Sequence, residues 1–217
     1  MKKWPALIVT VTCLCFAGCD NGTGTSGNGT PFTGPTSIEE VIEYLADKKQ
    51  DGSDPDNPVE LAVRINMNEW RQLLDAIRQV DKFVALDISR CYNIPQEFLF
   101  VYGGVRNDKI VSLVLPSETT SIWHGMFYGS TNLRQVTLPA NLTEIGAMAF
   151  GDCTDLKLVI FHAPAPPTMV PLQPAIPEGS EYLFYNTSPN LAIKVPAKSV
   201  AAYKAAWPTW ANRIGPI

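Results

Sequence analysis

The sequence predicts an α/β fold, a short solenoid of stacked parallel strands whose turns recur at a spacing of 23 along the chain. The main observation is a repeat, because the segment IVSLVLP at 110–116 recurs as LRQVTLP at 133–139. A constant spacing of this size is typical of a solenoid, in which each turn buries the apolar face of the next. The same spacing of 23 joins two further pairs of apolar residues: Ile122 with Ile145, and Phe127 with Phe150.

A third turn opens at Leu156 and continues through Val159 and Phe161 in the same spacing. Phe184 follows Phe150 at a spacing of 34, which equals one turn of 23 plus an insertion of 11. The side chains of the repeat that share the inward positions are expected to be buried in the stack. These are Leu115, Phe127, Val136, Leu138, Ile145, Phe150, Phe161, Phe184 and Val195.

A β-α-β unit precedes the repeats. Residues 37–48 carry a helical apolar stripe, and residues 59–65 alternate apolar with polar residues, which is a strand pattern. Asn68 is expected to cap a second helix, and residues 83–89 form the next strand. We expect the region 37–108 to cap the first turn, with its two strands parallel.

The repeats occupy residues 109–217 and include an insertion at 163–182 that contains six prolines. Because proline disfavours both helix and central strand, the insertion is predicted to be an extended surface loop. Residues 193–207 are expected to close the solenoid with a strand and a helix.

The N-terminus predicts export and lipidation. Lys2 and Lys3 precede an uncharged apolar run that is too short to span a bilayer, so residues 1–18 are interpreted as a signal peptide. The run ends in Phe-Ala-Gly-Cys, which resembles the lipobox of bacterial lipoproteins and makes Cys19 the lipidation site. Residues 19–36 are rich in Gly, Thr, Asn and Ser and are expected to form a flexible tether. The predicted location is the bacterial cell envelope, on the outer surface or the periplasmic face.

Composition excludes several classes of function. A 46% hydrophobic content argues against a disordered chain, and a net charge of −4 argues against a nucleic-acid binder. Beyond Cys19, Cys91 and Cys153 are too few for a disulfide framework or a zinc site, and we expect both to be buried. His124 and His162 lie outside catalytic motifs, so we expect no enzyme activity, no cofactor and no metal.

The segment 133–153, LRQVTLPANLTEIGAMAFGDC, resembles the leucine-rich repeat of BspA-like surface proteins from spirochaetes and other host-associated anaerobes. It follows the pattern L-x-x-V-x-L-P-x-x-L-x-x-I-G-x-x-A-F-x-x-C. The resemblance implies a lipid-anchored or secreted surface protein that binds other macromolecules, host matrix proteins among them. It does not imply one particular ligand.

The repeat also predicts which residues face outward on the strands. Val114, Leu158 and Ile160 are apolar at outward positions where polar residues are expected. This set either marks a contact site or is covered by the proline-rich insertion. The candidate partner-binding residues are Val114, Thr137, Leu158, Ile160, Pro166 and Pro167.

The leading functional hypothesis is a non-catalytic, lipid-anchored protein that mediates protein–protein interaction, including adhesion to host extracellular matrix or other cells. The alternative is a structural or assembly lipoprotein of the bacterial envelope whose partner belongs to the same cell. In both cases, the lipid anchor makes the membrane contact and no nucleic acid is involved.

Overall fold

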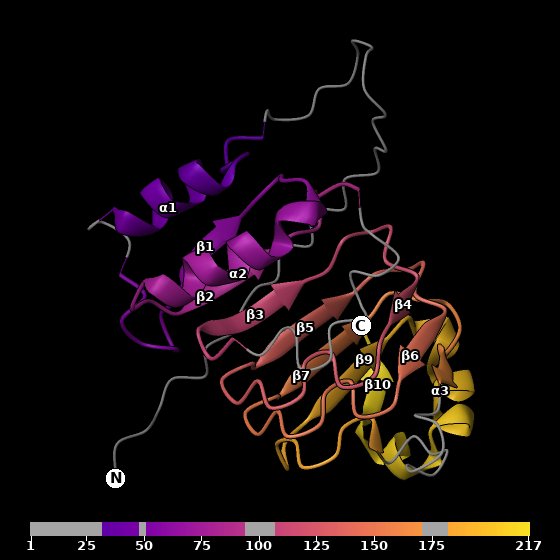
Figure 1. The fold of residues 1–217 in the computed structure, drawn as a ribbon. Coiled ribbons are helices and arrows are strands. Elements are labelled where there is room, and N and C mark those ends of the chain that lie inside the picture. The colour runs from indigo at the N-terminus through magenta and orange to yellow at the C-terminus, as the bar shows by residue number, and fades with distance from the viewer. Residues whose placement is uncertain (1–31, 48–50, 94–106, 171–181) are drawn as a thin grey trace, which may run out of the picture. The chain divides into compact units, whose positions relative to one another are not determined.

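The computed structural model describes residues 32–47, 51–93, 107–170 and 182–217 (Figure 1). The folded unit extends from Thr33 to Ile217. The predicted signal peptide and the lipidation site at Cys19 lie outside the described residues.

A parallel sheet runs through the folded unit (Figure 1). In the described part of the chain it contains seven strands, in the order β1-β2-β3-β5-β7-β9-β10. We call it the main sheet. Its strands are β1 (Val59–Ala62), β2 (Val84–Asp87), β3 (Ile110–Val114), β5 (Gln135–Leu138), β7 (Leu158–Phe161), β9 (Ala192–Val195) and β10 (Ile214–Pro216).

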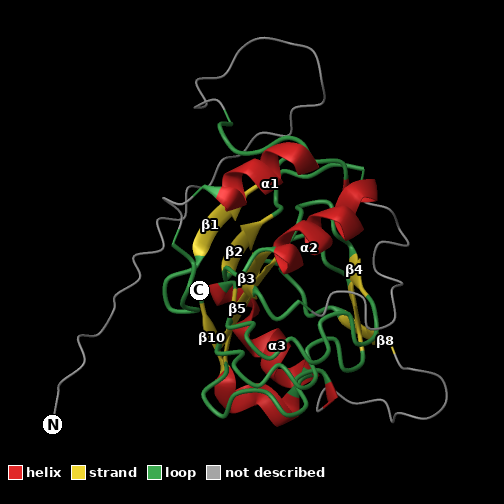
Figure 2. Ribbon diagram, turned by 60° about the vertical axis from the view of Figure 1, so that its left-hand side comes forward, coloured by secondary structure: helices red, strands yellow, loops and turns green. Residues whose placement is uncertain are grey.

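A smaller sheet forms where the chain returns between the strands of the main sheet (Figure 2). Its described strands are β4 (Ser121–Ile122), β6 (Glu144–Gly146) and β8 (Thr168–Val170), paired in that order and parallel. Each of the turns that begin at β3, β5 and β7 therefore contributes one strand to the main sheet and then one to the smaller sheet.

The strand register follows the spacing found in the sequence. Ser112 pairs with Gln135, and Gln135 pairs with Leu158, so the residue number rises by 23 at each step from β3 to β5 and from β5 to β7. From β7 to β9 the residue number rises by 34, because Leu158 pairs with Ala192. The mixed α/β composition and the parallel strands are consistent with the repeat solenoid that the sequence predicts.

The prediction of a surface loop over residues 163–182 is wrong for part of that segment. Residues 168–170 form β8, in which Met169 pairs with Ile145 of β6. A strand is possible here because β8 lies at the edge of the described small sheet, where flanking prolines do not interrupt a central ladder. Residues 171–181 lie outside the described residues.

A stack of phenylalanine rings runs through the repeats. The rings of Phe127 and Phe150 are nearly parallel, with centroids 5.1 Å apart, and Phe150 and Phe184 follow at 5.7 Å. All three side chains are buried. Trp210 ends the stack by contacting Phe184 edge-on at 5.5 Å. The ladder has the order that the repeat register predicts.

Two helices lie at the N-terminal end of the main sheet, α1 (Ile38–Ala46) and α2 (Trp70–Gln79). Ser37 caps α1 by accepting a hydrogen bond from the Glu40 amide. The prediction that Asn68 caps the second helix is wrong, because a 3-10 turn at Met67–Glu69 precedes α2. Asn66 caps that turn by accepting a hydrogen bond from the Asn68 amide.

The outer edge of β1 is covered by the segment that contains α1. The Tyr44 hydroxyl donates to the Glu60 carbonyl, and the Arg64 amide donates to the Pro35 carbonyl. These bonds satisfy backbone groups that an open edge strand would expose. Since Pro35 is buried, the folded body begins before residue 37, where the sequence suggested the end of the tether.

The C-terminal end is closed by α3 (Val200–Ala206) and the 3-10 turn at Pro208–Arg213 that follows it. Tyr203 and Trp207 are buried and pack against Phe161. The chain then adds β10 beside β9, a strand that the predicted strand-and-helix ending did not include.

Candidate protein-interaction surface

The main sheet has one face turned away from the phenylalanine ladder, and we call it the outer face. Side chains alternate along each strand, so every second residue points to this face. The strand registers align these residues in two rows across the sheet. One row contains Glu60, Ala85, Ser112, Gln135, Leu158 and Ala192; the other contains Ala62, Asp87, Val114, Thr137, Ile160, Lys194 and Gly215.

Four of the predicted partner-binding residues meet at the centre of the outer face. Val114, Thr137 and Ile160 are directly paired neighbours on β3, β5 and β7. Leu158 lies two residues before Ile160 on β7, in the adjoining row. All four are half-buried, so each still exposes part of its side chain. We call these four residues the apolar centre.

Pro166 and Pro167 do not join the apolar centre. They lie on the crossing from β7 to β8, and Pro167 is buried. The Ala163 and Pro164 carbonyls accept hydrogen bonds from the hydroxyls of Tyr203 and Ser199, which hold this crossing against the C-terminal cap. The described part of the insertion therefore leads into the smaller sheet.

Two acidic residues on the outer face were missed by the sequence reasoning. Glu60 on β1 and Asp87 on β2 lie on the same face as Val114, because β1 and β2 extend the repeat sheet. Burial, and to a lesser extent the nearby Asp87 carboxylate, raises the pKa of Glu60. The alternation at 59–65 could have revealed Glu60, had that strand been placed in the same sheet as the repeats.

The outer face is thus graded in charge. Its β1 and β2 end carries Glu60 and Asp87, its centre is apolar, and Lys194 lies on β9 at the other end. Polar and charged side chains around an apolar centre are the usual anatomy of a protein interface.

Three residues that could carry chemistry, His124, Cys91 and Cys153, are buried and hydrogen-bonded within the protein. The Nδ1 atom of His124 accepts a hydrogen bond from the Ala147 amide at 3.1 Å, and burial lowers the pKa of this histidine. Cys91 and Cys153 are free thiols, as expected, and burial raises their pKa values to about 11 and about 12. Thiols with such pKa values stay protonated at neutral pH and are poor nucleophiles.

Within the described residues, no three His, Cys, Asp or Glu side chains gather where they could bind a metal ion. None of the helices in that part of the chain has the length and apolar character needed to span a bilayer.

The parallel strands, in register at a spacing of 23, and the aromatic ladder behind them define a leucine-rich-repeat type of protein. Residues 105–166 match the family model described as "BspA type Leucine rich repeat region (6 copies)". Residues 105–166 are therefore BspA-type leucine-rich repeats, and repeats of this type suggest a role in protein interaction. No curated protein matches the chain in a sequence comparison.

Proposed function

We propose that this protein is a non-catalytic, lipid-anchored binding protein of the bacterial cell envelope, which holds a protein partner on its outer face. The observation that carries the proposal is the apolar centre, formed where a repeat strand requires no apolar side chain. In this view the repeat turns form a rigid solenoid. The α1–α2 and α3 segments act as its end caps.

The energetics of burial favour this role. Covering the part of a half-buried aliphatic side chain that is still exposed removes apolar surface from water and contributes up to about 1 kcal/mol, a fraction of the ~1.5–3 kcal/mol for a whole side chain. The apolar centre presents three such side chains: Val114 on β3, and Leu158 and Ile160 on β7. Strand β5 lies between these two strands. A few central residues of this kind commonly supply most of the affinity of a protein complex.

The central binding test replaces Ile160 by Lys. The variant should bind a partner about 10- to 150-fold more weakly, because it loses an aliphatic contact and the partner would cover an unpaired ammonium group. The probe is a solubilised basement-membrane matrix from a mammalian host, immobilised for biolayer interferometry. The matched control is Ile42→Lys, because Ile42 is an isoleucine on α1 with 47% of its surface exposed.

The outcomes separate the competing interpretations. Weak matrix binding by Ile160→Lys, with an unchanged melting temperature and a normal Ile42→Lys control, supports the proposal. If Ile160→Lys unfolds the protein, the apolar centre belongs to the core and the binding surface lies elsewhere. If both variants bind as the wild type does, the outer face is not the interface.

The anchor is tested at Cys19. The short charged start, the uncharged run and the lipobox resemblance support acylation of this cysteine. Mass spectrometry of the mature protein should show an acyl-modified N-terminus at Cys19, and Cys19→Ala should abolish it. A mature protein that begins elsewhere without an acyl mass would overturn this part of the proposal.

The side of the envelope decides between host matrix and an endogenous partner. Protease treatment of intact cells should remove the protein if it is displayed on the outer surface. Protection from protease favours the alternative, a structural or assembly lipoprotein with a partner in the same cell. Release of periplasmic proteins, measured in the same samples, is the control for cell integrity: intact cells should release none.

A further inference from the structure

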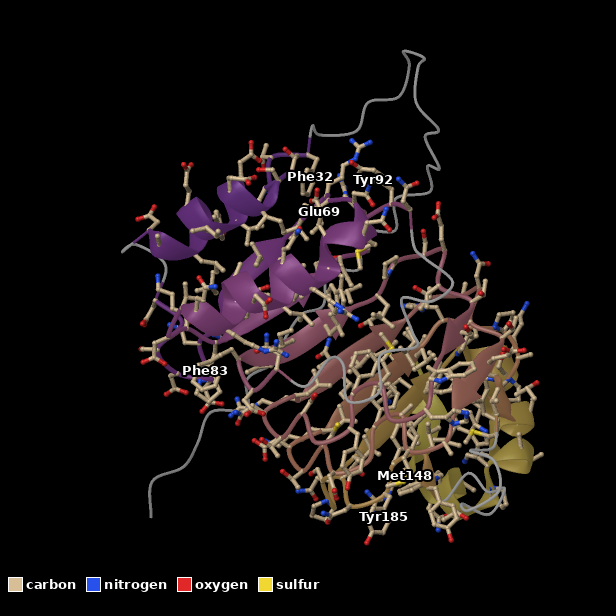
Figure 3. The ribbon with its side chains drawn as sticks, viewed as in Figure 1. Phe32, Glu69, Phe83, Tyr92, Met148 and Tyr185 are labelled. Atoms are coloured by element: carbon tan, nitrogen blue, oxygen red, sulfur yellow. The ribbon has the colours of Figure 1, made fainter. Side chains whose placement is uncertain are left out.

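Two exposed tyrosines lie on the turns that connect the smaller sheet to the main sheet. Tyr128 directly follows Phe127 of the ladder, and Tyr185 directly follows Phe184. While the phenylalanines are buried, Tyr128 is 40% exposed and Tyr185 is 52% exposed. Figure 3 labels Tyr185 on these turns, at the end of the molecule away from α1 and α2. This location is separate from the outer face.

The turn between them carries a glycine in the equivalent position. A Cβ atom added to Gly151 would lie 2.9 Å from Cδ2 and 3.1 Å from Cε2 of Tyr128. The Tyr128 ring therefore rests on the Gly151 backbone, in the space that a side chain would fill. One side of the ring is supported by this contact, and the exposed remainder faces solvent.

Hydrogen bonds tie the two tyrosine turns together through Asp152. The Asp152 amide donates to the Tyr185 carbonyl at 2.8 Å, and the Asn186 amide nitrogen Nδ2 donates to Oδ1 of Asp152 at 2.8 Å. A hydrogen bond from Tyr128, and then the one from Asn186, lower the pKa of Asp152, so this carboxyl is ionised at neutral pH. Its negative charge is not matched by a cation among the described residues.

We propose that Tyr128, Asp152, Tyr185 and Asn186 form a binding site for neutral hexopyranose units of a glycan. An aromatic ring has a negative face that attracts the weakly positive C–H groups on one side of a pyranose ring. A carboxylate accepts hydrogen bonds from sugar hydroxyls, and a carboxamide both donates and accepts. The four side chains supply both kinds of contact on one small surface.

The charge of the site selects among ligands. The carboxylate of Asp152 repels sulfated, sialylated or uronic-acid sugars, because these carry negative charge of their own. A protein partner would need a much larger surface, since each side of a stable protein interface buries about 800 Å². Four side chains on adjacent turns suit one or two sugar units better.

The experiment measures binding of cellohexaose, maltohexaose and chitohexaose to the whole folded protein by isothermal titration calorimetry. At least one of these neutral oligosaccharides should bind with a Kd of about 1 mM or tighter. Tyr128→Ala and Tyr185→Ala should each weaken that binding about 3- to 10-fold through the loss of one aromatic contact. Tyr92→Ala is the matched control, because Tyr92 is 47% exposed and lies near the N-terminal cap.

Four outcomes would overturn the proposal. In the first, none of the three oligosaccharides binds at millimolar concentration. In the second, Tyr92→Ala weakens binding as much as Tyr185→Ala does. In the third, an anionic probe such as heparin binds in place of the neutral sugars. In the fourth, an immobilised protein matrix loses affinity in the tyrosine variants. Ile160→Lys should leave sugar binding unchanged, so this site and the outer face are tested independently.

Discussion

Replacing Phe150 by Ala removes the middle ring of the aromatic ladder. Phe150 is fully buried and stacks on Phe127 at 5.1 Å and on Phe184 at 5.7 Å. The smaller side chain leaves a cavity in the repeat that has neighbours on both sides. Because the rings belong to three successive turns, the cavity also weakens the contact between those turns.

The expected loss of unfolding free energy follows from this geometry. Buried Phe→Ala changes cost about 3–5 kcal/mol, and each stacked aromatic pair adds about 0.5–1.5 kcal/mol to simple burial. A ring with two stacked partners belongs in the upper part of the range, at about 4–5 kcal/mol. Since domains are stable by about 5–15 kcal/mol, the variant should lose about a quarter or more of its stability. Its melting temperature should fall by about 8–20 °C.

The assay is urea unfolding followed by circular dichroism, with wild type and variants compared at one protein concentration. Phe83→Ala is the control, because Phe83 is half-buried and contacts Lys109 at the surface, with Nζ 4.7 Å from the ring centroid. It should cost less than about 2 kcal/mol. A Phe150→Ala loss below about 2 kcal/mol, or one equal to that of Phe83→Ala, would refute the ladder as a major source of stability.

Three further changes test the described packing. Thr119→Val should stabilise the protein by about 1 kcal/mol in urea unfolding, because the Thr119 hydroxyl is buried without a hydrogen-bond partner; a loss of stability would contradict this. Gly146→Ala should lower the free energy of unfolding by more than about 2 kcal/mol, because the added Cβ would clash with the His124 backbone nitrogen. Gly215→Ala is the control and should be nearly neutral, because its Cβ would meet only the end of the Lys194 side chain. Since burial lowers the pKa of His124, the folded state disfavours protonation, and stability should fall as pH decreases below about 6.5. His124→Gln should flatten that decrease in pH-dependent unfolding; equal slopes in the variant and the wild type would contradict the assignment.

The repeat was predictable because its signal is local and periodic. One apolar residue at a fixed position in every turn must face the same interior, so a spacing of 23 between Phe127 and Phe150 already implies that their rings meet. The alternation from Val59 to Ile65 likewise indicates a strand with one buried face. The Cys153 thiol was expected to be buried, since a lone cysteine behaves as a small apolar side chain.

The fate of the proline-rich insertion was not predictable from composition. Prolines around residues 163–177 indicated a loop, but the backbone groups of Thr168–Val170 find partners on β6 and form β8. A strand forms there because β6, residues 144–146, offers a free edge to pair with. Since β6 lies outside the insertion, no pattern within the insertion could reveal this pairing. The same reason explains why Pro166 and Pro167 do not lie beside the outer-face residues.

The sequence by itself determined the period of the repeat, the inward residues of each turn and the class of fold, because each depends on spacing along the chain. Only the tertiary structure decided which outward residues share a surface. It joined Glu60 and Asp87 to the face that carries Ile160, and it placed Asp152 between Tyr128 and Tyr185. These neighbours come from different turns or from outside the repeat, and their proximity follows from strand register and turn stacking, which no single segment encodes.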